Sequence, residues 1–229
     1  MPKNKNQTIR NTMIQAPKIG EGIFLSSDVS EILNLPYRSV KHLMFEYWDK
    51  HFESFGGKRL IGEKGNQSVN FLTLIEFYTY YKLRKSGISA KKVQKYYSTI
   101  SKDLNTPYPF ARRIHTDGKD VWYEKLEELI RADGKKQLDL KKIIGGFLQR
   151  IEFGSDYLAE RLYLLPDSKY IVVDPKHQFG QPTITGTNIR TEVIKKLYDG
   201  GETKASLCEL YSLKPKQISD ALRYYKKVA

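Results

Sequence analysis

Between residues 25 and 51, apolar side chains recur at the three- and four-residue spacing of amphipathic helices. The pattern breaks at Asn34-Leu35-Pro36, and proline is well suited to the first turn of a helix. We therefore predict a short helix that starts near Leu25, with Ser27 and Asp28 as cap residues, and a second helix from Tyr37 to about His51.

The next segment alternates between short β-prone runs and helical periodicity. Gly65-Asn66 separates the runs 55–61 and 68–71, which is typical of a β-hairpin. Thr73 and Glu76 have the spacing of a capping box, so we expect a helix from there to about Lys85. Ser89 should cap a further helix that ends near Leu104.

The pattern of the middle of the chain is weaker. Residues 110–123 indicate a hairpin that turns at Asp117-Gly118, and residues 138–149 have some helical character. Three runs are candidate strands of a small antiparallel sheet: 147–153, 158–165 and 170–173.

Three short helices are expected at the C-terminal end: Glu192–Tyr198, Lys204–Tyr211 and Pro215–Lys227. The predicted fold class is therefore α+β: an N-terminal winged helix-turn-helix, a small β-containing middle and a C-terminal three-helix helix-turn-helix unit. The predicted division is a flexible basic arm over 1–22, a winged-helix domain over 23–106, a middle segment over 107–175 and a three-helix domain over 176–229.

The most informative property of the composition is its positive charge. The 229 residues carry a formal net charge of +13, which attracts polyanions such as nucleic acid. No apolar run approaches the roughly 20 residues that a membrane helix needs, and neither a secretory signal nor a lipidation motif is recognised. With the lone Cys208, this favours a cytoplasmic protein that binds nucleic acid rather than a membrane. The alternative is a basic protein with no charged partner.

A helix-turn-helix needs a second helix with an exposed polar or basic face. The helix after Pro36 meets this requirement, and the following hairpin would supply basic side chains as a wing. The alternative is a helical core whose charged face is merely solvated. The predicted DNA-contacting residues of this unit are Tyr37, Arg38, Ser39, Lys41, His42, Lys58, Arg59 and Lys64.

This order of elements resembles the head of MerR-type regulators. The resemblance rests on Leu25-Ser26-Ser27-Asp28, the Asn34-Leu35-Pro36 turn, Trp48 at the end of the second helix, and the run 83–89 into the next helix. It covers about residues 25–104. The long segment 52–65 and the lack of a long dimerising helix depart from the family, so a MerR-type effector mechanism does not follow from it.

A more specific string, G-x-P-x-I-x-G-T-x-I, begins at Gly180. Glycine permits tight bends and proline stiffens the chain, so Gly180, Pro182, Gly186 and Thr187 are predicted to be structural and to dock the chain onto the three-helix unit. Phosphate binding by Gly186-Thr187 is the alternative, although no P-loop lysine follows.

From about Tyr170 to Lys226 the sequence resembles the antitoxin-like family called domain of unknown function 433, and within it the larger VapB-type antitoxins. The resemblance implies an antitoxin that neutralises a PIN-like ribonuclease toxin and represses its own operon. Asn188 stands where the family usually has arginine, so a contact made by that arginine is not carried over. Double-stranded DNA, the cognate toxin and a second copy of the chain are the implied partners.

Lysines flank the proline at the start of the last helix, where positive charge opposes the helix dipole. This cost makes sense if that helix end faces a phosphate or an acidic groove on a protein partner. The predicted DNA-contacting residues of the second unit are Lys214, Lys216, Gln217 and Arg223.

The sequence predicts no enzyme, no metal and no cofactor. The four histidines are scattered without metal-ligand spacing, and neither a nucleotide-binding loop nor a nucleophile elbow is present. Cys208 is expected to be a small core residue. Two other functions stay open beside the antitoxin: a stand-alone transcriptional regulator without a toxin, and a protein-interaction module whose basic surface binds an acidic protein.

Overall fold

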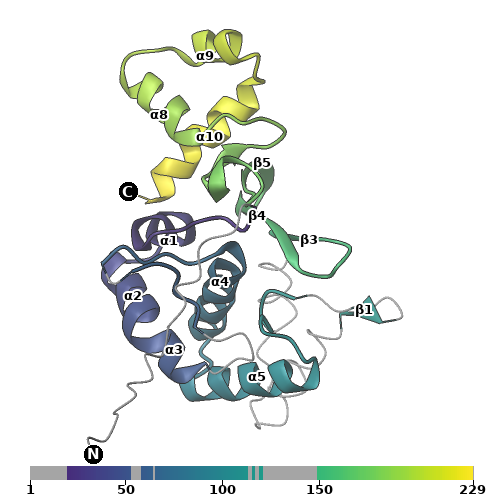
Figure 1. The fold of residues 1–229 in the computed structure, drawn as a ribbon. Coiled ribbons are helices and arrows are strands. Elements are labelled where there is room, and N and C mark those ends of the chain that lie inside the picture. The colour runs from purple at the N-terminus through teal and green to yellow at the C-terminus, as the bar shows by residue number, and fades with distance from the viewer. Residues whose placement is uncertain are drawn as a thin grey trace, which may run out of the picture.

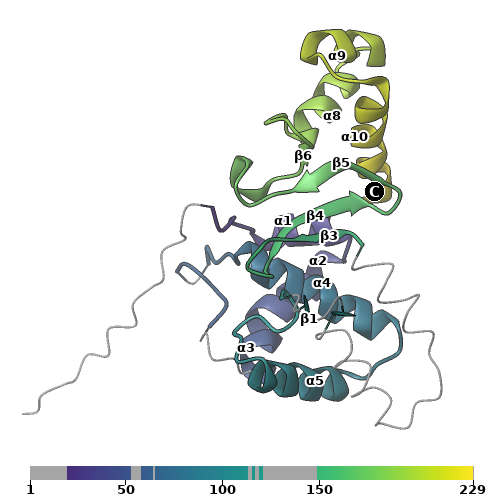
Figure 2. The ribbon, with the colours of Figure 1, turned by 90° about the vertical axis from the view of Figure 1, so that its right-hand side faces the viewer.

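A four-stranded antiparallel sheet lies between an N-terminal and a C-terminal group of helices (Figures 1 and 2). The structure is a computed structural model and describes residues 20–52, 58–63, 65–112, 115–116, 119–120 and 149–228. Over these residues the fold is mixed α and β, as the sequence predicts.

The N-terminal group consists of α1 (Ser26–Leu33), α2 (Tyr37–His42), η1 (Leu43–Tyr47), α3 (Trp48–His51), α4 (Phe71–Lys85) and α5 (Ala90–Asp103). Asn34 ends α1 in the left-handed conformation, so the predicted break is confirmed. Asp28 accepts a hydrogen bond of 2.8 Å from the backbone nitrogen of Leu25, which stabilises the start of α1. Gly87 ends the predicted helix before Ser89, which caps α5 through the backbone nitrogen of Lys92.

The predicted helix from Tyr37 to His51 is present, but its middle is a π-helical turn, η1. Such a turn rotates the following residues relative to the first part of the helix. It places Trp48 in the core against the rings of Phe52 and Phe77. The side chain of Trp48 is buried, and it joins the long helix to α4.

The predicted capping box of Thr73 and Glu76 is not formed. α4 begins at Phe71, and Asn70 is its cap, accepting a 2.9 Å hydrogen bond from the backbone nitrogen of Thr73. Glu76 does not reach back to a cap residue because its carboxylate is buried beside Arg59, at 3.3 Å from Nε. A tertiary ion pair therefore replaces the local interaction that the spacing indicated.

The segment predicted as a hairpin wing is a short loop in the described residues. Ile61 and Ser68 exchange two backbone hydrogen bonds of 2.9 Å, and Val69 pairs in the same way with Phe24 at 3.0 Å. Glu21, at the end of the predicted arm, already accepts a hydrogen bond from the backbone nitrogen of Phe71. Residues 1–19, like Lys64, lie outside the described residues.

The sheet has the strand order β3-β4-β5-β6, with bounds Ile151–Phe153, Ala159–Leu165, Ser168–Val173 and Thr183–Ile184. The three predicted strands of the middle segment are confirmed. β6 was not predicted, and it pairs with β5 through Ile184 opposite Ile171. The sheet therefore continues past residue 175, where the sequence analysis placed a domain boundary.

The predicted hairpin near Asp117-Gly118 is present as the antiparallel pair β1 (His115–Thr116) and β2 (Lys119–Asp120). The predicted helix over 138–149 lies almost wholly outside the described residues. Within the described residues, no helix is long and apolar enough to cross a bilayer.

The three predicted C-terminal helices are confirmed as α8 (Thr191–Asp199), α9 (Lys204–Tyr211) and α10 (Pro215–Val228). α10 packs on β4 and β5 as well as on α8 and α9. Its residues Ile218, Ala221 and Leu222 are buried as the helical spacing requires. In both views α9 lies at the end of the molecule away from α5 (Figures 1 and 2).

Candidate functional site

The outer face of α2 is the main candidate site. α1 packs behind α2, and Val40 is the buried residue of α2. Tyr37 is 50% exposed, and Arg38, Lys41 and His42 are exposed as well. Ser39 is half-buried. The structure therefore brings the five predicted α2 residues onto one short helix and leaves its cations accessible.

Local contacts orient this face. The Tyr37 hydroxyl accepts a hydrogen bond of 3.2 Å from Ser26 on α1, and the Lys41 ammonium lies 5.7 Å from the centroid of the Tyr37 ring. His42 Nδ1 is 3.1 Å from a carboxylate oxygen of Glu46. No ion pair within the described part of the chain holds Arg38 or Lys41. Their charge is therefore available to an anionic partner.

A shallow basic groove lies between α3 and α5, beyond the π-helical turn that follows α2. It is lined by His51 of α3 and by Lys91, Lys92, Gln94, Lys95 and Ser98 of α5. The side chain of Gln94 donates a 2.7 Å hydrogen bond to the Tyr47 hydroxyl. The ring of Tyr47 lies 5.9 Å from His42 and 4.4 Å from His51, so aromatic rings connect the α2 face with the groove.

This groove was not predicted from the sequence. Its signal was the spacing of Lys91 and Lys95, which lie one turn apart on the same helix. The missing information was tertiary, because only the packing of α3 against α5 places these lysines beside His51.

Two adjacent basic residues of the predicted wing differ in their exposure to solvent. Lys58 is exposed, whereas Arg59 is 4% exposed and enclosed by α4 and α5. Its guanidinium donates to the Tyr97 hydroxyl at 3.1 Å and to the carbonyl of Pro107, and it lies 4.0 Å from the Tyr108 ring centroid. Arg59 is therefore not a DNA contact, contrary to the prediction, because its guanidinium group is bonded inside the core.

Burial changes the pKa of both members of this core pair. Burial raises the pKa of Glu76 to about 7, although the charge of Arg59 opposes the shift. Arg59 is itself stabilised in its charged form: burial lowers its pKa, but Glu76 and Tyr97 outweigh that effect. The pair is therefore an element of stability rather than a surface for a partner.

The cations of α10 are mostly neutralised by the protein's own carboxylates. Arg223 makes two hydrogen bonds, of 2.7 and 3.0 Å, to Asp167 in the β4–β5 turn. Lys216 and Arg223 each lie 3.1 Å from Asp220, which is 1% exposed. The side chain of Gln217 accepts a hydrogen bond of 2.9 Å from the backbone of Lys214 and so caps the helix.

Four C-terminal residues were predicted to contact DNA. Among the described residues, Lys214 alone of these four has an exposed side chain that makes neither an ion pair nor a hydrogen bond; its backbone nitrogen donates to Gln217. Lysine charge at this end of α10 opposes the helix dipole, as expected. Asp220, in the same helix, reduces this unfavourable interaction because it pairs with Lys216. Among the predicted contact residues that the structure describes, those of α2 therefore keep more unpaired cationic charge than those of α10.

The G-x-P-x-I-x-G-T string begins at a junction between the two helical groups. Gly180 has φ +86° and lies against the ring of Phe24, and the backbone nitrogen of Ile23 donates to the carbonyl of Phe179 at 3.1 Å. The carbonyl of the buried Pro182 accepts a hydrogen bond of 2.9 Å from Thr191 at the start of α8. The string therefore docks on the N-terminal unit as well as on the three-helix unit.

The second half of the string closes a turn. The Thr187 hydroxyl donates to the carbonyl of Ile184 at 2.8 Å and accepts from the backbone nitrogen of Ile189 at 3.1 Å. The backbone nitrogen of Thr187 also donates to Ile184. Because both Thr187 donors are used within the turn, the geometry favours the structural role of Gly186-Thr187 over phosphate binding.

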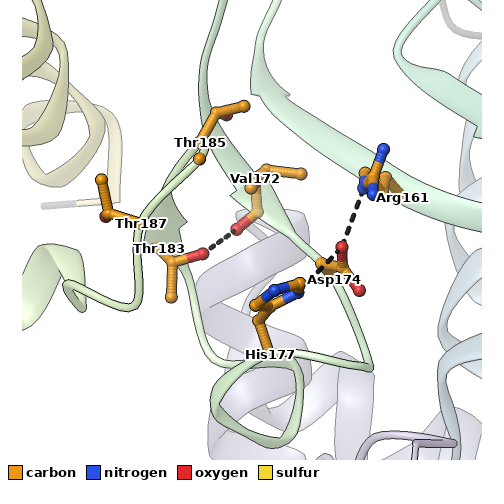
Figure 3. Close-up of a pocket in the computed structure, with 8 residues that line it drawn as sticks. Arg161, Val172, Asp174, His177, Thr183, Thr185 and Thr187 are labelled. Carbon is orange, nitrogen blue, oxygen red and sulfur yellow. Dashed lines mark hydrogen bonds and ion pairs between the residues drawn. The ribbon is translucent and has the colours of Figure 1, made fainter.

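A small hollow of about 210 Å³ lies beside this turn (Figure 3). On its wall, Arg161 donates a 2.8 Å hydrogen bond to Asp174, and His177 Nδ1 lies 3.2 Å from the same carboxylate. Arg161 also pairs with Glu152 at 2.6 Å. Burial alone would raise the pKa of Asp174, but hydrogen bonds from Arg161 and the Lys176 backbone hold it below its usual value.

This arrangement is poorly suited to catalysis. The Asp174–His177 pair could orient an imidazole, but each threonine hydroxyl on the wall donates to a backbone carbonyl: Thr183 to Val172, Thr185 to Lys169 and Thr187 to Ile184. No cluster of metal-ligating side chains occurs among the residues that the structure describes. Cys208 is half-buried, next to the core.

Comparisons with known proteins find similarity to a described family in the C-terminal part of the chain. Residues 171–225 match the family described as "Protein of unknown function (DUF433)". This DUF433-like segment runs from β5 to α10 and includes the G-x-P-x-I-x-G-T string.

Relatives from Mycobacterium tuberculosis (strain ATCC 25618 / H37Rv) extend the similarity. The protein described as "Putative antitoxin VapB45" is 24% identical over 168 residues, which cover 66% of this chain and 69% of the relative. "Uncharacterized protein Rv2308" is 42% identical over 78 residues, covering 32% of this chain and 33% of that protein. The chain is therefore similar, over about two thirds of its length, to a protein whose name describes it as a putative antitoxin.

The fold has a solved counterpart. The X-ray crystal structure of Rv2018 from Mycobacterium tuberculosis aligns with a TM-score of 0.69 and 21% identity, covering 87% of this chain and 96% of that one. The fold of most of this chain therefore has a counterpart in an experimental structure.

Proposed function

We propose that this protein is the DNA-binding antitoxin of a type II toxin–antitoxin pair, which neutralises a PIN-like ribonuclease toxin and represses its own operon without enzymatic activity. The observation that carries the DNA-binding part is the exposed face of α2, where Tyr37, Arg38, Lys41 and His42 project on one side while α1 packs on the other. In this proposal α1 and α2 form the helix-turn-helix and the loop closed by Ile61 and Ser68 is the wing.

The net charge of +13 and the basic groove of α5 support the same proposal. Arginine can hydrogen-bond to guanine edges, while lysine and tyrosine more often contact phosphates. Arg38 is therefore proposed as the reading residue, and Lys41, Lys58, Tyr37 and His42 as residues that fix the protein on the backbone. Lys64, which lies outside the described residues, is retained as a proposed wing contact.

The antitoxin part rests on the similarity to the protein described as "Putative antitoxin VapB45". The neutralised cations of α10 favour a division of labour, in which the N-terminal unit binds DNA and the DUF433-like segment binds the toxin. We further propose that the protein binds DNA as a homodimer, because two half-sites multiply the affinity of a single reading helix.

The change Arg38→Ala tests the reading role. It is expected to cost about 1–3 kcal/mol of binding free energy on the duplex upstream of the protein's own gene, and less on random duplex. Fluorescence anisotropy with the two labelled duplexes measures both values. Lys204→Ala, which removes an exposed charge from α9 at the other end of the molecule, is the matched control and should bind like the wild type.

Equal losses on the two duplexes would make Arg38 a phosphate contact, and no loss on either would refute its role. Co-purification with the product of the adjacent gene tests the toxin part separately. The Arg38→Ala variant should still capture a PIN-like toxin. DNA binding without toxin capture would instead identify a stand-alone regulator.

A further inference from the structure

A cavity of about 340 Å³ lies where the N-terminal helices meet the sheet and α10. Its walls come from α1 with the residues that follow it, from α4, from β4 with Pro166, and from Tyr224 of α10. Ile32, Leu164 and Pro166 supply apolar surface. Cavities of this size with apolar walls and a few polar groups are typical small-molecule sites.

Three cations converge on one side of this cavity. Lys82 and Lys85 lie one turn apart on α4, and Arg150 precedes β3. The Lys82 ammonium and the Arg150 guanidinium lie 5.2 and 5.4 Å from the centroid of the same ring, that of Tyr78. Cation–π contacts of this kind offset only part of the repulsion between two positive charges.

The position of Arg150 is fixed by the sheet. Its Nε donates to the carbonyl of Tyr163 and its Nη2 to that of Leu164, each at 2.7 Å. Lys82 is half-buried, and its burial, together with the charges of Arg150 and Lys85, lowers its pKa. Within the described ranges, no carboxylate forms an ion pair with any of the three cations.

The cavity lining also includes hydrogen-bonding groups from α1 and α10. The Tyr224 hydroxyl donates to Glu31 of α1 at 3.5 Å, and burial is the main cause that raises the pKa of this carboxyl. The lining therefore combines three cations, apolar surface and the hydrogen-bonded pair of Glu31 and Tyr224.

We infer that this cavity binds a small organic anion, with a carboxylate or phosphate group against Lys82, Lys85 and Arg150 and an apolar body against Leu164 and Pro166. A ligand anion supplies the negative charge that no carboxylate of the described residues brings to the three cations, in a partly buried place where charge-assisted hydrogen bonds are strong. Because the walls belong to both helical groups, the bound anion would stabilise their junction. This inference does not depend on DNA or toxin binding.

The full-length protein is titrated by calorimetry with three probes of similar shape: phenyl phosphate, benzoate and neutral benzamide. We expect saturable one-to-one binding of at least one anion with a Kd of about 1 mM or tighter, and no binding of benzamide in this range. A preference for phenyl phosphate or for benzoate then identifies the head group. Absence of binding by both anions, or equal binding of benzamide, would overturn the inference.

Charge-removing variants locate the site. Lys82→Gln should weaken anion binding by about 10- to 100-fold, since it removes a hydrogen bond to a charged group. Lys85→Gln, at a more exposed position, should also weaken it and is the safer variant for folding. Lys102→Gln, exposed on α5 and outside the cavity, is the matched control. The inference is overturned if the Lys102 variant loses as much affinity as the Lys85 variant.

Discussion

Replacing Arg59 by methionine is expected to lower the free energy of unfolding by about 3–5 kcal/mol, because it leaves the buried carboxylate of Glu76 without its partner. Both side chains are almost fully enclosed, at 3% and 0% exposure. The substitution also removes the donors to Tyr97 and Pro107, and with them the link between the loop after α3 and α5. Chemical denaturation followed by circular dichroism measures the loss.

Two variants control this result. Lys58→Met changes the neighbouring exposed cation and should alter stability by less than about 0.5 kcal/mol. The double change Arg59→Met with Glu76→Leu should recover much of the loss, since a buried ion pair can often be replaced by apolar side chains. A single Arg59 variant as stable as the wild type would contradict the buried pair.

The change Gly180→Ala is expected to destabilise the protein by about 2–4 kcal/mol, from two additive causes. The residue has φ +86°, where a side chain is strained, and a Cβ there would overlap the ring of Phe24. Phe24 is fully buried, so its ring cannot move aside without disturbing the core. Thermal and urea unfolding would show the loss directly.

Gly186→Ala separates the two causes. Gly186 has a similar φ of +79°, but among the described residues nothing lies within 4 Å of the place where its Cβ would stand. This variant should therefore lose only the backbone contribution, about 1–2 kcal/mol. If the two alanine variants lose the same stability, the close contact between the DUF433-like segment and Phe24 is refuted.

Local signals in the sequence predict most of the helices and strands correctly. Asn34 and Gly87 break helices, Ser89 caps one, and the spacing of apolar residues in α10 defines its buried stripe. These features depend on residues a few positions apart, and the sequence contains that information.

The errors arise where distant residues meet. The capping box at Thr73 is not formed because Glu76 turns to Arg59, and β6 exists because Ile184 finds Ile171 across the sheet. The charge of Arg223 is neutralised by Asp167, which lies 56 residues away in the chain. Neither composition nor periodicity reports such pairings, since they depend on the tertiary fold.

The same distinction applies to the candidate site. The α2 residues were predictable because a helix after Pro36 has one inner and one outer face. The groove of α5 and the cation cluster at Lys82 were not, because each is assembled from elements that are separate in the sequence.

If the exposed cationic face of α2 binds the DNA backbone, the affinity of the protein for DNA depends strongly on salt concentration. For wild-type protein on duplex DNA, the logarithm of the association constant should fall linearly and steeply with the logarithm of salt concentration, with about 6–10 phosphate contacts. The variant Lys41→Ala, which removes a proposed phosphate contact, should have a slope shallower by about one. Weak, salt-insensitive binding, or an unchanged slope in the variant, would show that the α2 face does not contact DNA phosphates.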